Sequence, residues 1–72
     1  MSIFSEKLKE YRKVKGLTQK QLAELAGTTE RVIQNYELAE KKPGLDKLVS
    51  IADALDVSLD FLVGRSDDPT RH

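Results

Sequence analysis

Four polar residues fall on one side of a short segment of this 72-residue chain, and their types suit hydrogen bonding to base edges. In residues 30–36, ERVIQNY, helical spacing places Val32, Ile33 and Tyr36 on the opposite, inward face. Arginine forms paired hydrogen bonds with guanine, and asparagine or glutamine does so with adenine. The outward face that could carry this chemistry consists of Glu30, Arg31, Gln34 and Asn35.

These side chains need a fixed support, and residues 19–36 provide one if they form two short helices joined by a corner. Ala23 is small enough to let the second helix cross the first closely. Gly27, four residues later, suits the left-handed backbone of such a corner, which costs an ordinary side chain about 1–2 kcal/mol. The spacing predicts a helix-turn-helix.

Both helix starts of this motif have their own signals. Thr18 and Gln21 have the spacing of a capping box, which predicts that the first helix begins near residue 19. Thr28 and Thr29 supply a cap for the second helix, and Glu30 lies in its first turn, where the helix dipole favours negative charge.

Apolar residues at helical spacing predict three further helices, so the fold class is all-α. The first runs from about Ile3 to Lys15, with Ser2 as its cap and Gly16 at its end. Two more are expected at Leu45 to Leu55 and at Leu59 to Val63. We expect one domain over residues 1–64 and a polar, flexible tail over residues 65–72.

The sequence offers little to any other class of site. It contains no cysteine, no metal-ligand spacing and no combination of nucleophile, base and orienting group, so we expect no enzyme, no metal and no cofactor. His72, the only histidine, lies at the very end and is expected to be inert. The absence of a long apolar run or a signal-like start predicts a cytoplasmic protein without membrane contact.

Charge is balanced overall but unevenly distributed. The chain has 12 basic and 12 acidic residues, which does not by itself indicate a nucleic-acid partner. Residues 1–20 carry six basic and two acidic side chains, whereas residues 43–72 carry three basic and six acidic ones. Such a chain can present one basic face to phosphates, although two ordinary solvated surfaces would have the same composition.

The run LTQKQLAELAGTTERVIQNYE is followed by a lysine-containing loop with a proline and then by LDKLVSIADALDVSLDFLVG. This series resembles the Xre family of phage-repressor and Cro-like helix-turn-helix regulators, from about Phe4 to Gly64. The resemblance implies a compact five-helix phage-repressor-like DNA-binding domain. Its third helix would enter the major groove and read bases.

The resemblance, together with side-chain chemistry, suggests individual roles on this third helix. Arg31 would bind guanine and Asn35 adenine. Glu30 could accept a hydrogen bond from cytosine, or could serve only as the anion of the first turn, and the sequence leaves both interpretations open. The expected base-reading set is Thr29, Glu30, Arg31, Gln34 and Asn35.

Phosphate contacts are expected around this set. Gln19 matches a family position at the start of the second helix that commonly contacts a phosphate, and Thr28 is a second candidate. Lys41 and Lys42 follow the third helix in a loop that often contacts the DNA backbone in the family. Many relatives have a glycine near Ala39, so the turn before the two lysines could differ here.

Two further expectations come from the resemblance. Arg12 and Glu37 match family positions that commonly form an ion pair between the first and third helices; two unpaired surface charges are the alternative. The end of the domain helps to form a two-fold dimer in the family, which places an interface at Leu59, Phe61 and Val63. The alternative is that these residues complete the core of the monomer.

Together these features predict a sequence-specific double-stranded DNA-binding regulator, a repressor that binds a palindromic operator as a homodimer. The alternative is an antitoxin-like protein-interaction module with the same fold. No sensor domain follows the helix-turn-helix, so no small-molecule ligand is expected. The protein is expected to be nucleoid-associated, and its gene could lie on a phage, another mobile element or a bacterial chromosome.

Overall fold

The computed structural model describes residues 2–71, so the expectation for His72 lies outside the described residues. Within this range the chain forms five α-helices and no strand: α1 (Ile3–Val14), α2 (Gln19–Ala26), α3 (Glu30–Glu37), α4 (Leu45–Leu55) and α5 (Leu59–Leu62). The all-α prediction is confirmed, and each predicted helix is present. Only α1 and α5 end one residue earlier than expected.

The helix starts follow the capping signals of the sequence. Thr18 Oγ1 accepts from the Gln21 N–H at 3.0 Å and Gln21 Oε1 accepts from the Thr18 N–H at 2.9 Å, which completes the predicted capping box. Ser2 also forms a capping box, with Ser5 as its partner. Side-chain caps satisfy N–H groups that would otherwise lack a partner, and such caps stabilise a helix by about 1 kcal/mol.

The corner between α2 and α3 has the predicted geometry. Gly27 is left-handed, with φ of 71°, and the Thr28 N–H donates to the Ala23 carbonyl at 2.9 Å. Ala23 is buried, and α2 packs against both α3 and α4. The left-handed corner predicted at Gly27 is confirmed, and the close helix crossing assigned to Ala23 stays a prediction.

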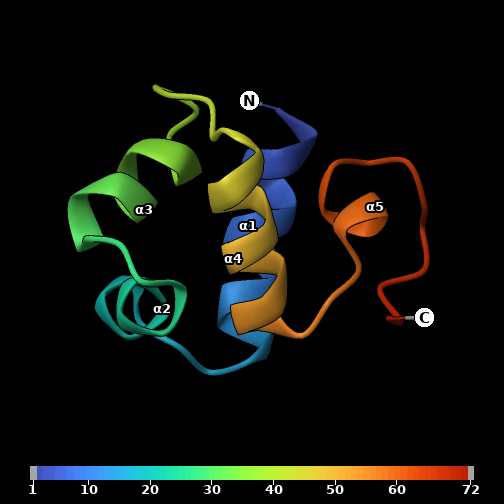
Figure 1. The fold of residues 1–72 in the computed structure, drawn as a ribbon, viewed down its shortest axis with the longest axis horizontal. Coiled ribbons are helices and arrows are strands. Elements are labelled where there is room, and N and C mark those ends of the chain that lie inside the picture. Colours follow the sequence, from blue (N-terminus) through green and yellow to red (C-terminus); the bar gives the residue numbers. More distant parts are fainter. Residues whose placement is uncertain (1, 72) are drawn as a thin grey trace.

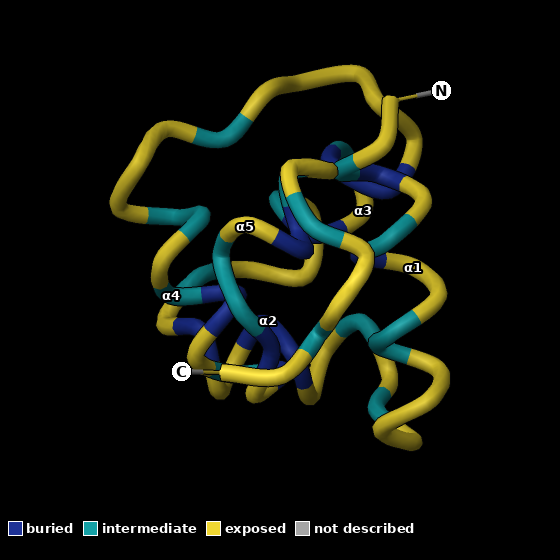
Figure 2. The backbone as a smooth tube through the Cα atoms, turned by 90° about the vertical axis from the view of Figure 1, so that its right-hand side faces the viewer, coloured by how far each residue is buried: buried dark blue, intermediate teal, exposed yellow. Residues whose placement is uncertain are grey.

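Packing around α1 and α4 holds the helix-turn-helix in place. These two helices lie in the middle of the molecule, with α2 and α3 on one side and α5 with the C-terminal segment on the other (Figure 1). The buried residues gather on the inward sides of the helices, while the loops are mostly exposed (Figure 2). The fully buried large side chains are Leu8, Leu22, Ile33, Ile51, Leu55, Leu62 and Val57.

Phe61 corrects the expectation for the dimer interface. Its side chain is only 3% exposed and packs edge-to-face on Tyr11, with ring centroids 4.9 Å apart. The Lys7 ammonium lies over the Phe61 ring, 4.3 Å from its centroid. Phe61 therefore completes the core of the monomer, which was the alternative interpretation. Leu59 and Val63 stay half-buried and retain surface for a partner.

The C-terminal segment, residues 65–71, belongs to the predicted flexible tail and contacts the rest of the domain in the structure. It returns to the junction of α4 and α5, where the Ser58 N–H donates to the Pro69 carbonyl at 2.9 Å. Arg71 then pairs with Asp53 at 2.7 Å, and its guanidinium lies 3.9 Å from Asp56. These contacts are made by backbone groups and single charged side chains, so a search for apolar periodicity in the sequence does not predict them.

Candidate nucleic-acid interface

The outward face of α3 carries polar side chains that have no hydrogen-bond partner among residues 2–71. Ile33 and Tyr36 are buried beneath it, and their burial fixes the rotation of the helix. Glu30, Arg31 and Gln34 are exposed and Asn35 is half-buried; among the described residues none of these four side chains forms a hydrogen bond or ion pair. The base-reading candidates are therefore presented together on one face with free donors and acceptors.

The start of α3 is fixed by Thr29. Its hydroxyl accepts from the Val32 N–H at 3.3 Å, as predicted for a cap. Thr29 is exposed and Thr28 is half-buried, so both lie at the edge of the polar face. Glu30, in the first turn, lies where the helix dipole stabilises a negative charge.

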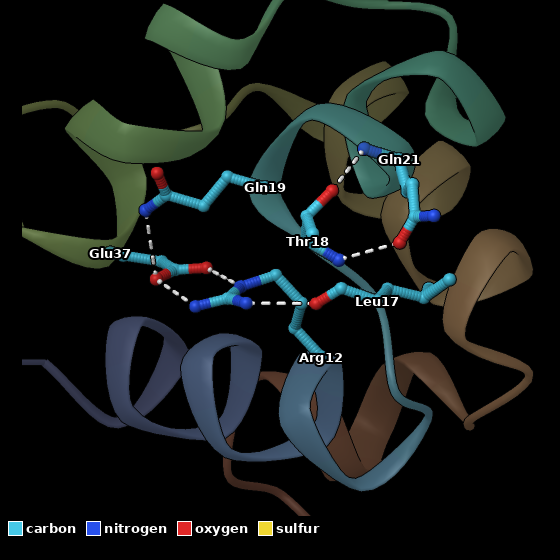
Figure 3. Close-up of polar contacts among 6 residues, drawn as sticks. All are labelled: Arg12, Leu17, Thr18, Gln19, Gln21 and Glu37. Atoms are coloured by element: carbon cyan, nitrogen blue, oxygen red, sulfur yellow. Dashed lines mark hydrogen bonds and ion pairs between the residues drawn. The ribbon is translucent and has the colours of Figure 1, made fainter.

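The predicted ion pair between α1 and α3 is present and buried. Arg12 Nε donates to Glu37 Oε2 at 2.6 Å, and Arg12 Nη2 donates to Glu37 Oε1 at 3.1 Å (Figure 3). The side chains are 12% and 4% exposed, respectively. Arg12 Nη1 also donates to the Leu17 carbonyl at 2.8 Å, next to the start of α2. This arrangement ties α1 to the end of α3 and to the α1–α2 connection.

Gln19 has a contact that the sequence did not predict. Its Nε2 donates to Glu37 Oε1 at 3.2 Å, so the side chain expected at a phosphate also belongs to the buried network (Figure 3). The two residues are 18 positions apart, and no spacing rule connects them. At the same helix start, the backbone N–H groups of Gln19 and Lys20 have no acceptor within residues 2–71, which leaves them available to an anion.

The loop after α3 contains a non-glycine residue in a left-handed conformation. Ala39 has φ of 59°, a left-handed conformation that costs a non-glycine residue about 1–2 kcal/mol. Its N–H donates to the Tyr36 carbonyl at 3.1 Å, and the Glu40 N–H donates to the Asn35 carbonyl at 2.9 Å. The turn therefore closes as it would with glycine, at the cost of backbone strain.

Lys41 and Lys42 follow this turn and are exposed. They border a shallow groove of about 270 Å³ whose other walls include Phe4, Pro43 and Leu48. Neither ammonium group forms an ion pair with another described residue. Both charges therefore remain available to an external anion.

The acidic residues near the C-terminus lie away from this surface. Asp53 and Asp56 at the end of α4 are near Arg71, and Asp60 is on α5, which lies at the opposite end of the molecule from α3 (Figure 1). Repulsion between these carboxylates and an anion at α3 is screened strongly with distance, because the Debye length is about 8 Å at physiological ionic strength. The uneven charge distribution is thus compatible with an anionic partner at α3.

Other classes of site receive no support from the described residues. No cluster of three or more histidine, cysteine or acidic side chains within residues 2–71 could hold a metal ion. None of the helices in this part of the chain has the length and apolar character needed to cross a bilayer.

Comparison with known proteins adds a family and several relatives. The profile of a family described as helix-turn-helix matches residues 8–62. YobD of Bacillus subtilis (strain 168), an HTH-type transcriptional regulator, is 43% identical over 67 residues, which cover 93% of this chain and 60% of YobD. RstR of Vibrio cholerae, a transcriptional repressor of the cryptic phage CTXphi, is 42% identical over 60 residues, or 83% of this chain and 54% of RstR.

The fold has a close structural counterpart in the P22 c2 repressor protein, solved in complex with a synthetic operator. The TM-score is 0.84 and the match covers 92% of this chain and 100% of that chain. The sequence identity is 24%, so this likeness shows the fold alone. The chain spans 60% or less of the length of the two relatives above, so it corresponds to a part of each.

Proposed function

This chain belongs to the Xre-type helix-turn-helix family of transcriptional regulators, and on that premise we propose that it is a repressor that binds double-stranded DNA. The observation that carries the proposal is the outward face of α3. Arg31, Gln34 and Asn35 have free hydrogen-bonding groups there, on a helix whose orientation is fixed by burial and by the Arg12–Glu37 pair. Free polar groups on a rigid helix suit the major groove.

Side-chain chemistry divides the roles on α3. Arg31 binds guanine through its two-pronged guanidinium, and Asn35 binds adenine through its amide. Each such paired contact discriminates against a wrong base by about 1–3 kcal/mol. Thr29, Glu30 and Gln34 complete the base-facing set.

Contacts to the DNA backbone flank these residues and set the register of α3. Gln19 and the free N–H groups at the start of α2 bind one phosphate, and Thr28, between α2 and α3, contacts the backbone as well. Lys41 and Lys42, in the loop after α3, add further backbone contacts. Such contacts position the protein and carry no sequence information directly.

A dimer would give the specificity that a domain of this size lacks. A single α3 reads few base pairs, whereas a two-fold dimer reads two half-sites about 34 Å apart on a palindromic operator. Leu59 and Val63, half-buried on and after α5, are the surface that we assign to this interface. Phe61 is excluded from it because the core encloses its ring.

Selection from a pool of random duplexes tests this proposal. Purified protein is mixed with the pool at about 50 mM and about 200 mM salt, and the retained DNA is sequenced. We expect an enriched inverted repeat whose binding weakens by about one power of salt concentration per neutralised phosphate. An Asn35→Ala variant should relax the preference at one position of each half-site.

The opposite result would favour the protein-interaction alternative. Weak enrichment with little salt dependence would contradict DNA binding as the function, because phosphate contacts release counterions and apolar contacts do not. The apolar groove bordered by Phe4, Pro43 and Leu48 would then be the first surface to test for a protein partner.

A further inference from the structure

One buried carboxylate joins the three helices that the proposed interface depends on. Glu37, the last residue of α3, accepts two hydrogen bonds from Arg12 of α1 and a third from Gln19, the first residue of α2 (Figure 3). The third bond joins Gln19 Nε2 to Glu37 Oε1 at 3.2 Å. Glu37 is 4% exposed, so water does not replace these donors.

The chemistry of this contact fixes which end of the Gln19 amide points inward. An ionised carboxylate only accepts hydrogen bonds, so the amide nitrogen of Gln19 must face Glu37. The nitrogen carries two N–H groups in one plane, and holding one of them sets the direction of the other. Among the described residues this second N–H has no acceptor. Gln19 is half-buried, so part of its side chain is accessible to an external anion.

We propose that Glu37 is a positioning residue for the phosphate contact at the start of α2. It holds the Gln19 amide with its nitrogen oriented to bridge the buried carboxylate and a DNA phosphate. This inference rests on the proposed function and deepens it. Glu37 ends the helix that carries Arg31 and Asn35, so it also fixes the phosphate contact relative to the base-reading side chains.

Arg12 makes this arrangement possible. Its guanidinium binds Glu37 with two hydrogen bonds and the Leu17 carbonyl with a third, so the carboxylate is charged, oriented and attached to the chain that leads into α2. Without Arg12 the Glu37 carboxylate would keep only the Gln19 amide of its three hydrogen-bond donors and would lose the contacts that fix its orientation. The orientation of Gln19 thus depends on the whole network.

Single uncharged phosphates test the coupling. The operator duplex obtained by selection is prepared with a methylphosphonate at one position at a time, and binding is measured for wild type and Gln19→Ala. Neutralising the phosphate next to α2 should weaken the binding of wild type about tenfold more than it weakens the binding of Gln19→Ala, the size of a charge-assisted hydrogen bond. We call this ratio of the two losses the excess. When the same comparison is made between Glu37→Gln and the double variant Glu37→Gln, Gln19→Ala, the excess should fall to about threefold or less, because a neutral amide no longer fixes the orientation of Gln19.

A matched variant and a spectroscopic signal separate positioning from stability. Gln21→Ala removes another glutamine of α2 that contacts Thr18 and not Glu37, so it should leave the excess at its wild-type value. Circular dichroism establishes the temperature at which Glu37→Gln is folded; if it does not fold, Glu37→Asp is used, which shortens the side chain and should also reduce the excess. The side-chain amide resonances of Gln19 should shift in the Glu37 variant and stay unchanged in Gln21→Ala.

The outcomes separate this inference from the proposed function. If the protein binds its operator and the excess is the same with wild-type Glu37 as in the Glu37→Gln or Glu37→Asp variant, Glu37 does not position Gln19 and the inference is wrong. If no methylphosphonate position distinguishes wild type from Gln19→Ala, Gln19 binds no phosphate and the inference is also wrong. If no duplex is enriched at all, the proposed function fails together with it.

Discussion

Two arginine–carboxylate pairs of this domain differ in how far they are buried. Arg12 and Glu37, at the α3 end, are 12% and 4% exposed and make two hydrogen bonds with each other. Arg71 and Asp53, at the end with α5, are 45% and 56% exposed. Similar charges therefore have different consequences: the buried pair orients the helix that we propose to read DNA, whereas the exposed pair holds a C-terminal segment to the surface.

The largest effect should come from breaking the buried pair. Glu37→Ala leaves the Arg12 guanidinium buried without a counter-charge, which should lower the free energy of unfolding by about 3–5 kcal/mol. Asp53→Ala is the matched control at the exposed pair and should cost about 1 kcal/mol or less. Urea unfolding followed by circular dichroism measures both, and equal losses would mean that burial does not distinguish the two pairs.

Removing positive charge next to α3 should affect DNA binding differently from removing it next to α5. The double variant Lys41→Gln, Lys42→Gln should lower the slope of log affinity against log salt by about 0.9 for each lysine that contacts a phosphate. Arg65→Gln removes an exposed charge at the α5 end and should leave the slope unchanged. A similar decrease in both proteins would indicate that net charge, and not the position of the lysines, determines the salt dependence.

Replacing Ala39 with glycine should stabilise the domain, whereas most substitutions destabilise a protein. Ala39→Gly relieves the left-handed strain in the turn after α3 and should raise the free energy of unfolding by about 1 kcal/mol. Ala54→Gly, within α4, should lower it by about the same amount because glycine is a poor helix former. Thermal unfolding of the two variants provides the comparison. A loss of stability in Ala39→Gly would show that the turn is not strained.

The smallest effect is expected at the exposed pair itself. Arg71→Ala should lower the free energy of unfolding by about 0–1 kcal/mol, and the difference should shrink at high salt. The experiment compares urea midpoints at low and high ionic strength. A larger effect that persists in high salt would mean that the C-terminal segment contributes through packing.

Much of the scaffold was predictable because local chemistry determines it. Thr18, Gln21 and Gly27 set the ends of α2 through contacts within a few residues, and these signals can be read directly from spacing. The Arg12–Glu37 pair was predicted from the family resemblance. Its partners are 25 residues apart, so spacing alone gave no indication of it.

The remaining features depend on tertiary placement. The Gln19–Glu37 hydrogen bond joins the start of α2 to the end of α3, and its partners are 18 residues apart, so no rule of local spacing predicts it. Phe61 lies among apolar neighbours in a segment too short for periodicity to show which of them turn inward. The return of the C-terminal segment uses the backbone of Ser58 and Pro69, groups that every sequence contains.

If α3 reads bases, an Asn35→Ala variant should lose specificity for the selected duplex. Affinity is measured for the selected duplex and for a scrambled duplex of equal length at one salt concentration, with Thr70→Ala, in the C-terminal segment, as control. We predict that the ratio of the two affinities falls in Asn35→Ala by a factor corresponding to about 1–3 kcal/mol per contact, while binding to the scrambled duplex is unchanged. An unchanged ratio, or an equal loss on both duplexes, would contradict base reading by α3.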